Sequence, residues 1–124
     1  MLAPSDEAKV YLWTKATDMR CGFDRLVGLV QEQMGLQVLS GGIYVFVARA
    51  RDRVKLLWWD RDGYALFYKR LEAGTFKITC KDGAEELTGV DLKLLLSGMD
   101  IERIKLRKNV ESGLYSDREY ANHS

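Results

Sequence analysis

Two runs of aromatic and branched residues meet at a short turn near the middle of the chain, and together they predict a β-hairpin. The turn reads Asp-Arg-Asp-Gly over residues 60–63, and an Asp-Gly pair between two such runs is a strong hairpin signal. The first predicted strand covers residues 53–59 and the return strand covers residues 64–71. A further turn at residues 72–74 leads into a short strand predicted over residues 75–79. Because these strands follow one another through short turns, we expect an antiparallel meander.

Two strands and a helix are predicted before this hairpin. Residues 9–13 form a short strand rich in apolar and aromatic side chains. Apolar residues then recur at helical spacing from Phe23 to Met34, and Gly35 is suited to end that helix. A strand over residues 43–47 is apolar on both faces, which predicts a central position in a sheet.

The last predicted helix, residues 89–97, has boundary signals at both ends. Thr88 and Asp91 stand at the spacing of a capping box, and Gly98 is suited to end the helix. Residues 103–107 alternate between charged and apolar side chains and are predicted as an edge strand.

The predicted fold class is α+β, an antiparallel β-meander of four or five strands with two main helices packed on one face. Residues 1–108 are expected to form a single domain, and residues 109–124 a polar, flexible C-terminal tail. A chain of 124 residues is long enough to bury a sizeable core without a disulfide or a metal.

Several classes of function are disfavoured by what the sequence lacks. Its single histidine, His123, leaves no histidine-based acid–base pair and no zinc site with the usual ligands. No phosphate-binding glycine loop, nucleophile elbow or dinucleotide fingerprint occurs. The one close acidic pair, Asp60 and Asp62, is typical of a turn, and Cys21 is interpreted as an inert thiol. We therefore expect a protein that is not an enzyme and that uses neither a metal nor another cofactor.

The compartment is predicted from three further features. The longest apolar runs fall well short of the ~18 residues that a membrane span needs. The first residues lack the basic-then-apolar layout of a signal peptide. The two cysteines, Cys21 and Cys80, are too few for a secreted disulfide scaffold. We expect a cytoplasmic protein without membrane contact.

The pattern most informative about function is a group of cations around the hairpin. Cations occupy every second position over residues 49–55, so an extended chain would point all four to one side. Residues 49–70 hold seven cations against three carboxylates, a net +4, whereas residues 83–100 hold one lysine against four carboxylates, a net −3. Nearby aromatic residues suit phosphate contact combined with stacking. The predicted nucleic-acid contacts are Arg49, Arg51, Arg53, Lys55, Lys69 and Arg70. The alternative is a solvated hairpin whose charges keep its edge from pairing with other sheets.

Several segments, taken together, resemble one protein family. Residues 17–24, Thr-Asp-Met-Arg-Cys-Gly-Phe-Asp, are similar to a signature of the TnpB accessory proteins of bacterial insertion sequences of the sixty-six family. The match continues in order through residues 45–46, 52–60, 63–64 and 68–72, then Gly74 and Phe76. The matched motif residues are Asp18, Met19, Arg20, Gly22, Phe23, Trp59, Asp60 and Gly63. The resemblance covers roughly residues 8–100, and it is to the small second-reading-frame protein, not to the RNA-guided nuclease of the same name.

This resemblance implies a non-catalytic accessory factor for DNA transposition. Such a factor is encoded beside a larger transposase and acts with it and with a second small accessory protein of the same element. We expect contact with double-stranded transposon DNA, with the transposase, or with both, and therefore an association with the nucleoid. The alternative is a pure protein–protein adaptor with no DNA binding of its own. Cys21 stands where the family has a basic residue, and Val47 and Ala48 replace a commonly polar, basic pair.

The segment over residues 18–24 also has a structural interpretation. It joins the first strand to the first helix, where Gly22 permits close approach of the backbone. Phe23 is expected to anchor the helix on the sheet, and Asp18 to cap helix N–H groups. Arg20 is expected to pair with an acidic neighbour or with a phosphate.

Overall fold

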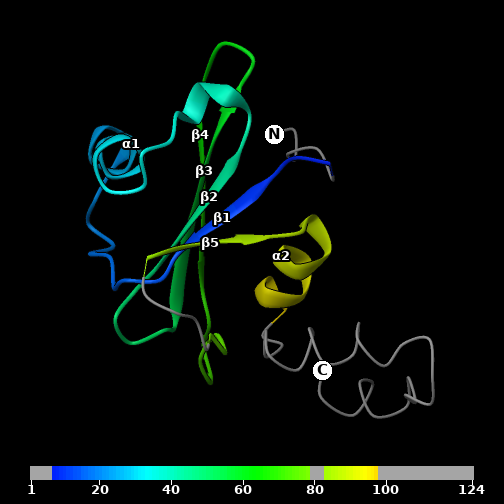
Figure 1. The fold of residues 1–124 in the computed structure, drawn as a ribbon. Coiled ribbons are helices and arrows are strands. Elements are labelled where there is room, and N and C mark those ends of the chain that lie inside the picture. Colours follow the sequence, from blue (N-terminus) through cyan, green and yellow to red (C-terminus); the bar gives the residue numbers. More distant parts are fainter. Residues whose placement is uncertain (1–6, 79–82, 98–124) are drawn as a thin grey trace, which may run out of the picture.

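The structure, a computed structural model, describes residues 7–78 and 83–97. Figure 1 shows a single β-sheet with a helix on each side of it. The elements in chain order are β1 (Val10–Trp13), α1 (Phe23–Glu32), the 3-10 helix η1 (Val38–Ser40), β2 (Ile43–Val47), β3 (Arg53–Asp60), β4 (Gly63–Arg70), β5 (Ala84–Leu87) and α2 (Gly89–Leu96). The predicted helix end at Gly98, the strand over residues 103–107 and the tail over residues 109–124 lie outside the described residues.

The five strands of the sheet have the order β4-β3-β2-β1-β5. Strands β2, β3 and β4 form the predicted antiparallel meander, and Asp60 pairs with Gly63 at its tight turn. Strand β5 is antiparallel to β1, whereas β1 and β2 run parallel. A parallel pair needs a long crossover connection, and here that connection contains α1. The α+β class and the meander are therefore confirmed, with one parallel pair that the sequence analysis did not predict.

The two helices lie on opposite faces of the sheet, so the prediction that both pack on one face was wrong. In β1, Val10 and Leu12 belong to the core beneath α2, whereas Trp13 belongs to the core beneath α1. Figure 1 shows α1 and α2 on either side of the strands. The physical reason lies in β2, whose five residues are all buried. With both helices on one side, one apolar face of this central strand would remain in water.

Helix α1 packs on its face of the sheet through Leu26 and Val30, which are fully buried. Its N-cap is Gly22, where a Cβ would meet nothing within 4 Å, so the close backbone approach predicted at this glycine was wrong. The helix begins at the predicted residue, and Gly35 follows it with a φ of 67°, the left-handed conformation expected there. The amphipathic spacing therefore predicted this helix and the face that it buries.

The strand predicted over residues 75–79 was wrong within its described part. Residues 75–78 form no strand, although Phe76 and Ile78 are buried in the core beneath α2. The Phe76 N–H donates to the Arg51 carbonyl oxygen at 2.6 Å, which ties this irregular segment to the β2–β3 connection. The fifth strand is instead β5, Ala-Glu-Glu-Leu, whose residues are mostly poor strand formers. Pairing with β1, and not its own propensity, makes β5 a strand.

Helix α2 begins with the predicted capping box. The Asp91 N–H donates to Thr88 Oγ1 and the Thr88 N–H donates to Asp91 Oδ2, each at 3.1 Å. These bonds satisfy N–H groups that the first helical turn leaves without a partner. The helix then buries Leu92 and Leu95 against the sheet.

Replacing Thr88 by alanine is expected to lower the free energy of unfolding by about 1 kcal/mol, because the Asp91 N–H loses its acceptor. Urea unfolding followed by circular dichroism measures the change. Val90→Ala is the matched control in the same helical turn, since Val90 is exposed and alanine favours a helix. A Thr88→Ala protein as stable as the Val90→Ala protein would contradict the assignment of the cap.

Candidate nucleic-acid interface

The β2–β3 connection changes the predicted arrangement of the cations. Arg49 and Arg51 lie in this connection, and only Arg53 and Lys55 belong to β3. Arg51 has a φ of 59°, and its N–H donates to the Ala48 carbonyl oxygen at 2.8 Å. The chain turns here instead of remaining extended, so the prediction that the four cations point to one side was wrong.

Lys55 is buried, with 7% of its surface exposed. Its Nζ donates to the Cys21 carbonyl oxygen at 2.9 Å and lies 4.8 Å from the centroid of the Tyr68 ring. The side chain therefore connects β3 to the loop that precedes α1. An ammonium committed to these internal contacts stabilises the fold and is turned away from solvent phosphate.

Lys69 and Arg70 end β4 on opposite faces of the sheet. Lys69 Nζ donates to the Leu96 carbonyl oxygen at 2.6 Å, at the last residue of α2, where a cation is favoured by the helix dipole. Arg70 is exposed, and its Nε lies 3.1 Å from a carboxylate oxygen of Glu72. Lys69 thus fixes a helix end, whereas Arg70 faces solvent.

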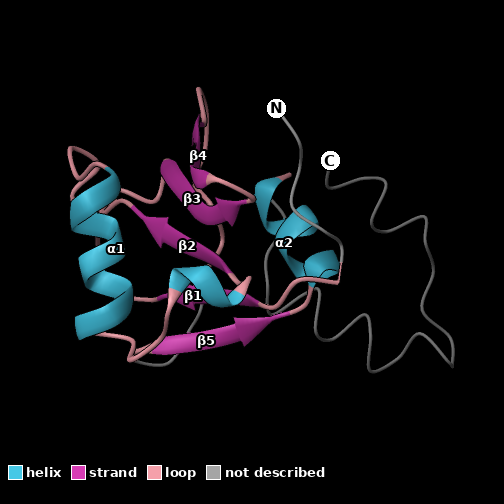
Figure 2. Cartoon of the chain, turned by 90° about the horizontal axis from the view of Figure 1, so that it is seen from above, coloured by secondary structure: helices cyan, strands magenta, loops and turns pink. Residues whose placement is uncertain are grey.

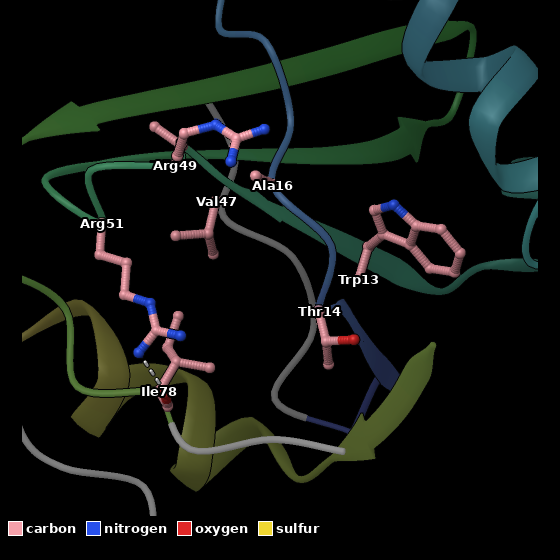
Figure 3. Close-up of a pocket in the computed structure, with 8 residues that line it drawn as sticks. Trp13, Thr14, Ala16, Val47, Arg49, Arg51 and Ile78 are labelled. Carbon is pink, nitrogen blue, oxygen red and sulfur yellow. Dashed lines mark hydrogen bonds between the residues drawn. The ribbon is translucent and has the colours of Figure 1, made fainter. Parts of the chain in front are cut away.

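A surface cavity of about 230 Å³ lies where β1 and β2 end. Figure 3 shows Arg49 and Arg51 rising from the β2–β3 connection on either side of Val47, with Thr14 across the cavity. Its lining residues are Trp13, Thr14, Ala16, Val47, Ala48, Arg49, Arg51 and Ile78. None of these eight is acidic, so the two arginines are the charged residues of this lining.

Backbone contacts hold the cavity in shape. Arg51 Nη1 donates to the Ile78 carbonyl oxygen at 2.6 Å, which anchors its guanidinium at the rim. On the other side, Thr14 Oγ1 donates to the Gly83 carbonyl oxygen at 2.6 Å. Each guanidinium has five N–H donors in a planar fork that matches the oxygens of a phosphate. The arrangement can therefore bind an anion without a metal.

The position of this cavity explains why sequence analysis found only its arginines. Trp13 and Val47 are the last residues of β1 and β2, the two parallel strands. Ligands of sheets with parallel strands commonly bind beyond the carboxyl ends of those strands. The parallel pairing was not predicted, so Thr14, Ala16 and Ile78 carried no signal that they would meet the arginines.

The residues of the loop before α1 divide into buried and exposed members. Met19 is buried in the core beneath α1. Arg20 and Asp18 form an exposed ion pair, with Arg20 Nη2 2.7 Å from an Asp18 carboxylate oxygen, and this hydrogen bonding lowers the pKa of Asp18 below its usual range. The Asp18 carboxylate also accepts from the Arg20 N–H and does not cap α1. Phe23 is 44% exposed, so the prediction that it anchors the helix was wrong.

The hairpin motif residues shape the turn and the edge of the sheet. Asp60 closes the turn with Gly63, and the intervening Arg61 has a φ of 58°. Trp59 is half-buried and meets the Tyr64 ring edge to face, with centroids 5.1 Å apart. These contacts give Asp60 and Gly63 a structural role at the turn.

Two negative observations concern residues 7–78 and 83–97 alone. No three His, Cys, Asp or Glu side chains lie close enough together there to hold a metal ion. Within the same residues, no helix combines the length and the apolar character required to cross a membrane.

A mixed five-stranded sheet between two helices, with two arginines at a cavity beside its parallel strands, defines a small α+β domain with a basic surface cavity. The chain belongs to the family described as IS66 Orf2 like protein, whose model matches residues 8–106. This membership confirms the resemblance and associates the protein with transposition of insertion sequences in an accessory role.

Two relatives come from Sinorhizobium fredii. The uncharacterized protein y4hO is 40% identical over 101 residues, which cover 81% of this chain and 88% of that protein. The uncharacterized protein y4jC is 36% identical over 112 residues, covering 90% of this chain and 95% of that protein. No solved structure matches the chain.

Proposed function

We propose that this protein is a non-catalytic accessory factor of transposition that contacts the phosphates of transposon DNA through Arg49 and Arg51. The observation that carries the proposal is the cavity at the ends of β1 and β2, which Arg49 and Arg51 both line and whose lining contains no acidic residue. Phosphate contacts of this kind position a protein on DNA without reading its sequence. Its proposed partners are the transposase and a second small accessory protein of the same element, at the nucleoid in the cytoplasm.

The structure favours a smaller set of contacts than the six cations expected from the sequence. Arg53 and Arg70 are retained beside Arg49 and Arg51, because their guanidinium groups reach solvent. Lys55 and Lys69 are left out, because Lys55 is buried and the half-buried Lys69 donates to the last carbonyl of α2. Arg51 also donates to a backbone carbonyl, but its side chain is exposed and keeps further N–H donors for a phosphate.

A protein–protein adaptor without DNA binding is the second candidate. Exposed apolar side chains favour it, among them Phe23 on α1, Leu39 on η1 and Val90 on α2. A pull-down with the transposase, with and without nuclease treatment, separates the two. Disappearance of the complex after nuclease supports DNA contact, whereas its survival together with absent DNA binding supports the adaptor.

The test of the proposed contact is a salt titration of duplex-DNA binding by fluorescence anisotropy. Replacing Arg49 and Arg51 together by glutamine is expected to weaken binding to all sequences alike. It should also flatten the log–log salt slope by about 0.9 for each phosphate that the protein no longer neutralises. Glutamine keeps much of the side-chain length, so the fold should be retained.

The matched control is the double replacement of Lys9 and Arg25 by glutamine. It removes the same charge from exposed positions at the amino end of β1 and on α1. This control should leave most of the salt slope intact. Equally weakened binding in the two double variants would show that only overall charge matters, and the cavity would no longer be the contact site.

A further inference from the structure

We infer a second nucleic-acid surface on the hairpin, where two exposed tyrosines of β4 flanked by arginines are suited to stack the unpaired bases of a single DNA strand. This inference rests on the proposed function, because it assumes that the protein meets transposon DNA. It concerns the face of the hairpin and not the arginine cavity, although Arg53 and Arg70 serve both proposals, and it concerns a different form of DNA.

The sheet register places the tyrosines on one face. Leu57 of β3 pairs with Leu66 of β4, and both contribute to the core beneath α1. Side chains alternate along a strand, so Tyr64 and Tyr68 lie on this same face, about 13 Å apart along β4. They are 36% and 50% exposed. The two rings are exposed because β4 lies at the edge of the sheet, beyond the end of α1, as Figure 2 shows.

Each ring is held in place by a neighbour on β3. Lys55 stands opposite Tyr68, and its Nζ lies 4.8 Å from that ring's centroid. Trp59 stands opposite Tyr64 and meets it edge to face at an interplanar angle of 78°. Rings that are already oriented lose little conformational freedom when a base stacks on them.

Arginines supply phosphate contacts beside the rings. Arg53 pairs with Arg70 in the register, at the end of the same face next to Tyr68. Asp52 lies 3.4 Å from Arg53 in a partly exposed ion pair, and Glu72 lies 3.1 Å from Arg70 in an exposed one. Exposed pairs of this kind are weak, so a phosphate can compete for the guanidinium groups.

This combination fits an unpaired strand better than a duplex. Stacking on an aromatic side chain needs the open face of a base, and the faces in a duplex are already covered by neighbouring bases. A positively charged surface with protruding rings is the usual means of holding a single strand without sequence preference. The occupant of this face is therefore a single strand, such as one exposed at a transposon end.

The experiment compares binding of a labelled oligothymidylate and of a duplex by the full chain. Replacing Tyr64 or Tyr68 by leucine should weaken oligothymidylate binding by about 5- to 100-fold, because each ring stacks on a base. The salt slope should stay unchanged, since the same phosphates remain neutralised. Phenylalanine at either position keeps the ring and should restore most of the affinity.

Leu39→Ala is the control for removal of an exposed apolar side chain, because Leu39 lies on η1 and is 58% exposed. The glutamine variants of Arg49 and Arg51 should weaken duplex binding more than oligothymidylate binding, which separates the two surfaces. Duplex binding without oligothymidylate binding would overturn this inference and leave the proposed function standing. Unchanged oligothymidylate binding with reduced transposase capture in Tyr68→Leu would also overturn it, in favour of a protein interface.

Discussion

Replacing Phe76 by alanine is expected to lower the free energy of unfolding by about 3–5 kcal/mol, the usual cost of emptying a fully buried aromatic site. Phe76 is 1% exposed in the core beneath α2, although its segment belongs to no strand. Its N–H also donates to the Arg51 carbonyl oxygen at 2.6 Å. The substitution should therefore loosen the β2–β3 connection and weaken duplex binding as well as stability.

Urea unfolding with tryptophan fluorescence measures this effect. Lys77→Ala is the neighbouring control, because Lys77 is exposed, and such positions usually change stability by less than about 0.5 kcal/mol. If Phe76→Ala and Lys77→Ala were equally stable, residues 75–78 would not pack against the sheet as described.

Replacing Lys55 by methionine is expected to cost about 1–3 kcal/mol of stability. Methionine keeps the apolar stem, but it removes the charge-assisted donor to the Cys21 carbonyl oxygen. That carbonyl then lacks its partner beside a side chain that is almost fully buried. Chemical denaturation measures the change, and the loop before α1 should exchange its amide hydrogens faster.

The comparison with Arg49→Gln makes this prediction informative about function. Arg49 is exposed, so its substitution should change DNA affinity and leave stability almost unchanged. Lys55→Met should lower stability and leave DNA affinity almost unchanged. If Lys55→Met retained full stability and no longer bound DNA, Lys55 would belong with the phosphate contacts, as the alternating pattern alone suggested.

Local patterns predicted much of the fold. The hairpin follows from aromatic runs around an Asp-Gly turn, and α1 from apolar spacing that buries Leu26 and Val30. The capping box at Thr88 predicted the start of α2. In each case the sequence signal and the contact that it produces lie within a few residues of each other.

The pairing of distant segments was not predictable in the same way. Strand β5 exists because β1 offers it a partner, and its own residues favour a strand only weakly. Phe76 and Ile78 alternate like a strand, yet their burial is satisfied without a sheet ladder. Alternation reports which side chains are buried, and it leaves open whether the backbone pairs.

The candidate site shows the same division. Its arginines were visible in the sequence as a charge pattern, but their directions were not. The left-handed conformation of Arg51 turns the chain. Lys55 and Lys69 donate to the carbonyl oxygens of Cys21 and Leu96, respectively. The cavity itself depends on the parallel pairing of β1 and β2, which brings Thr14 to the arginines.

The sequence by itself determined the class, the hairpin, both main helices and the family, because these depend on local spacing and on residue identity. Only the tertiary structure decided which face each helix covers and which cations remain in solvent. Those outcomes depend on contacts between residues far apart in the chain, such as Lys55 with Cys21. Burial and carbonyl partners at such contacts decide whether a lysine stabilises the fold or faces a phosphate.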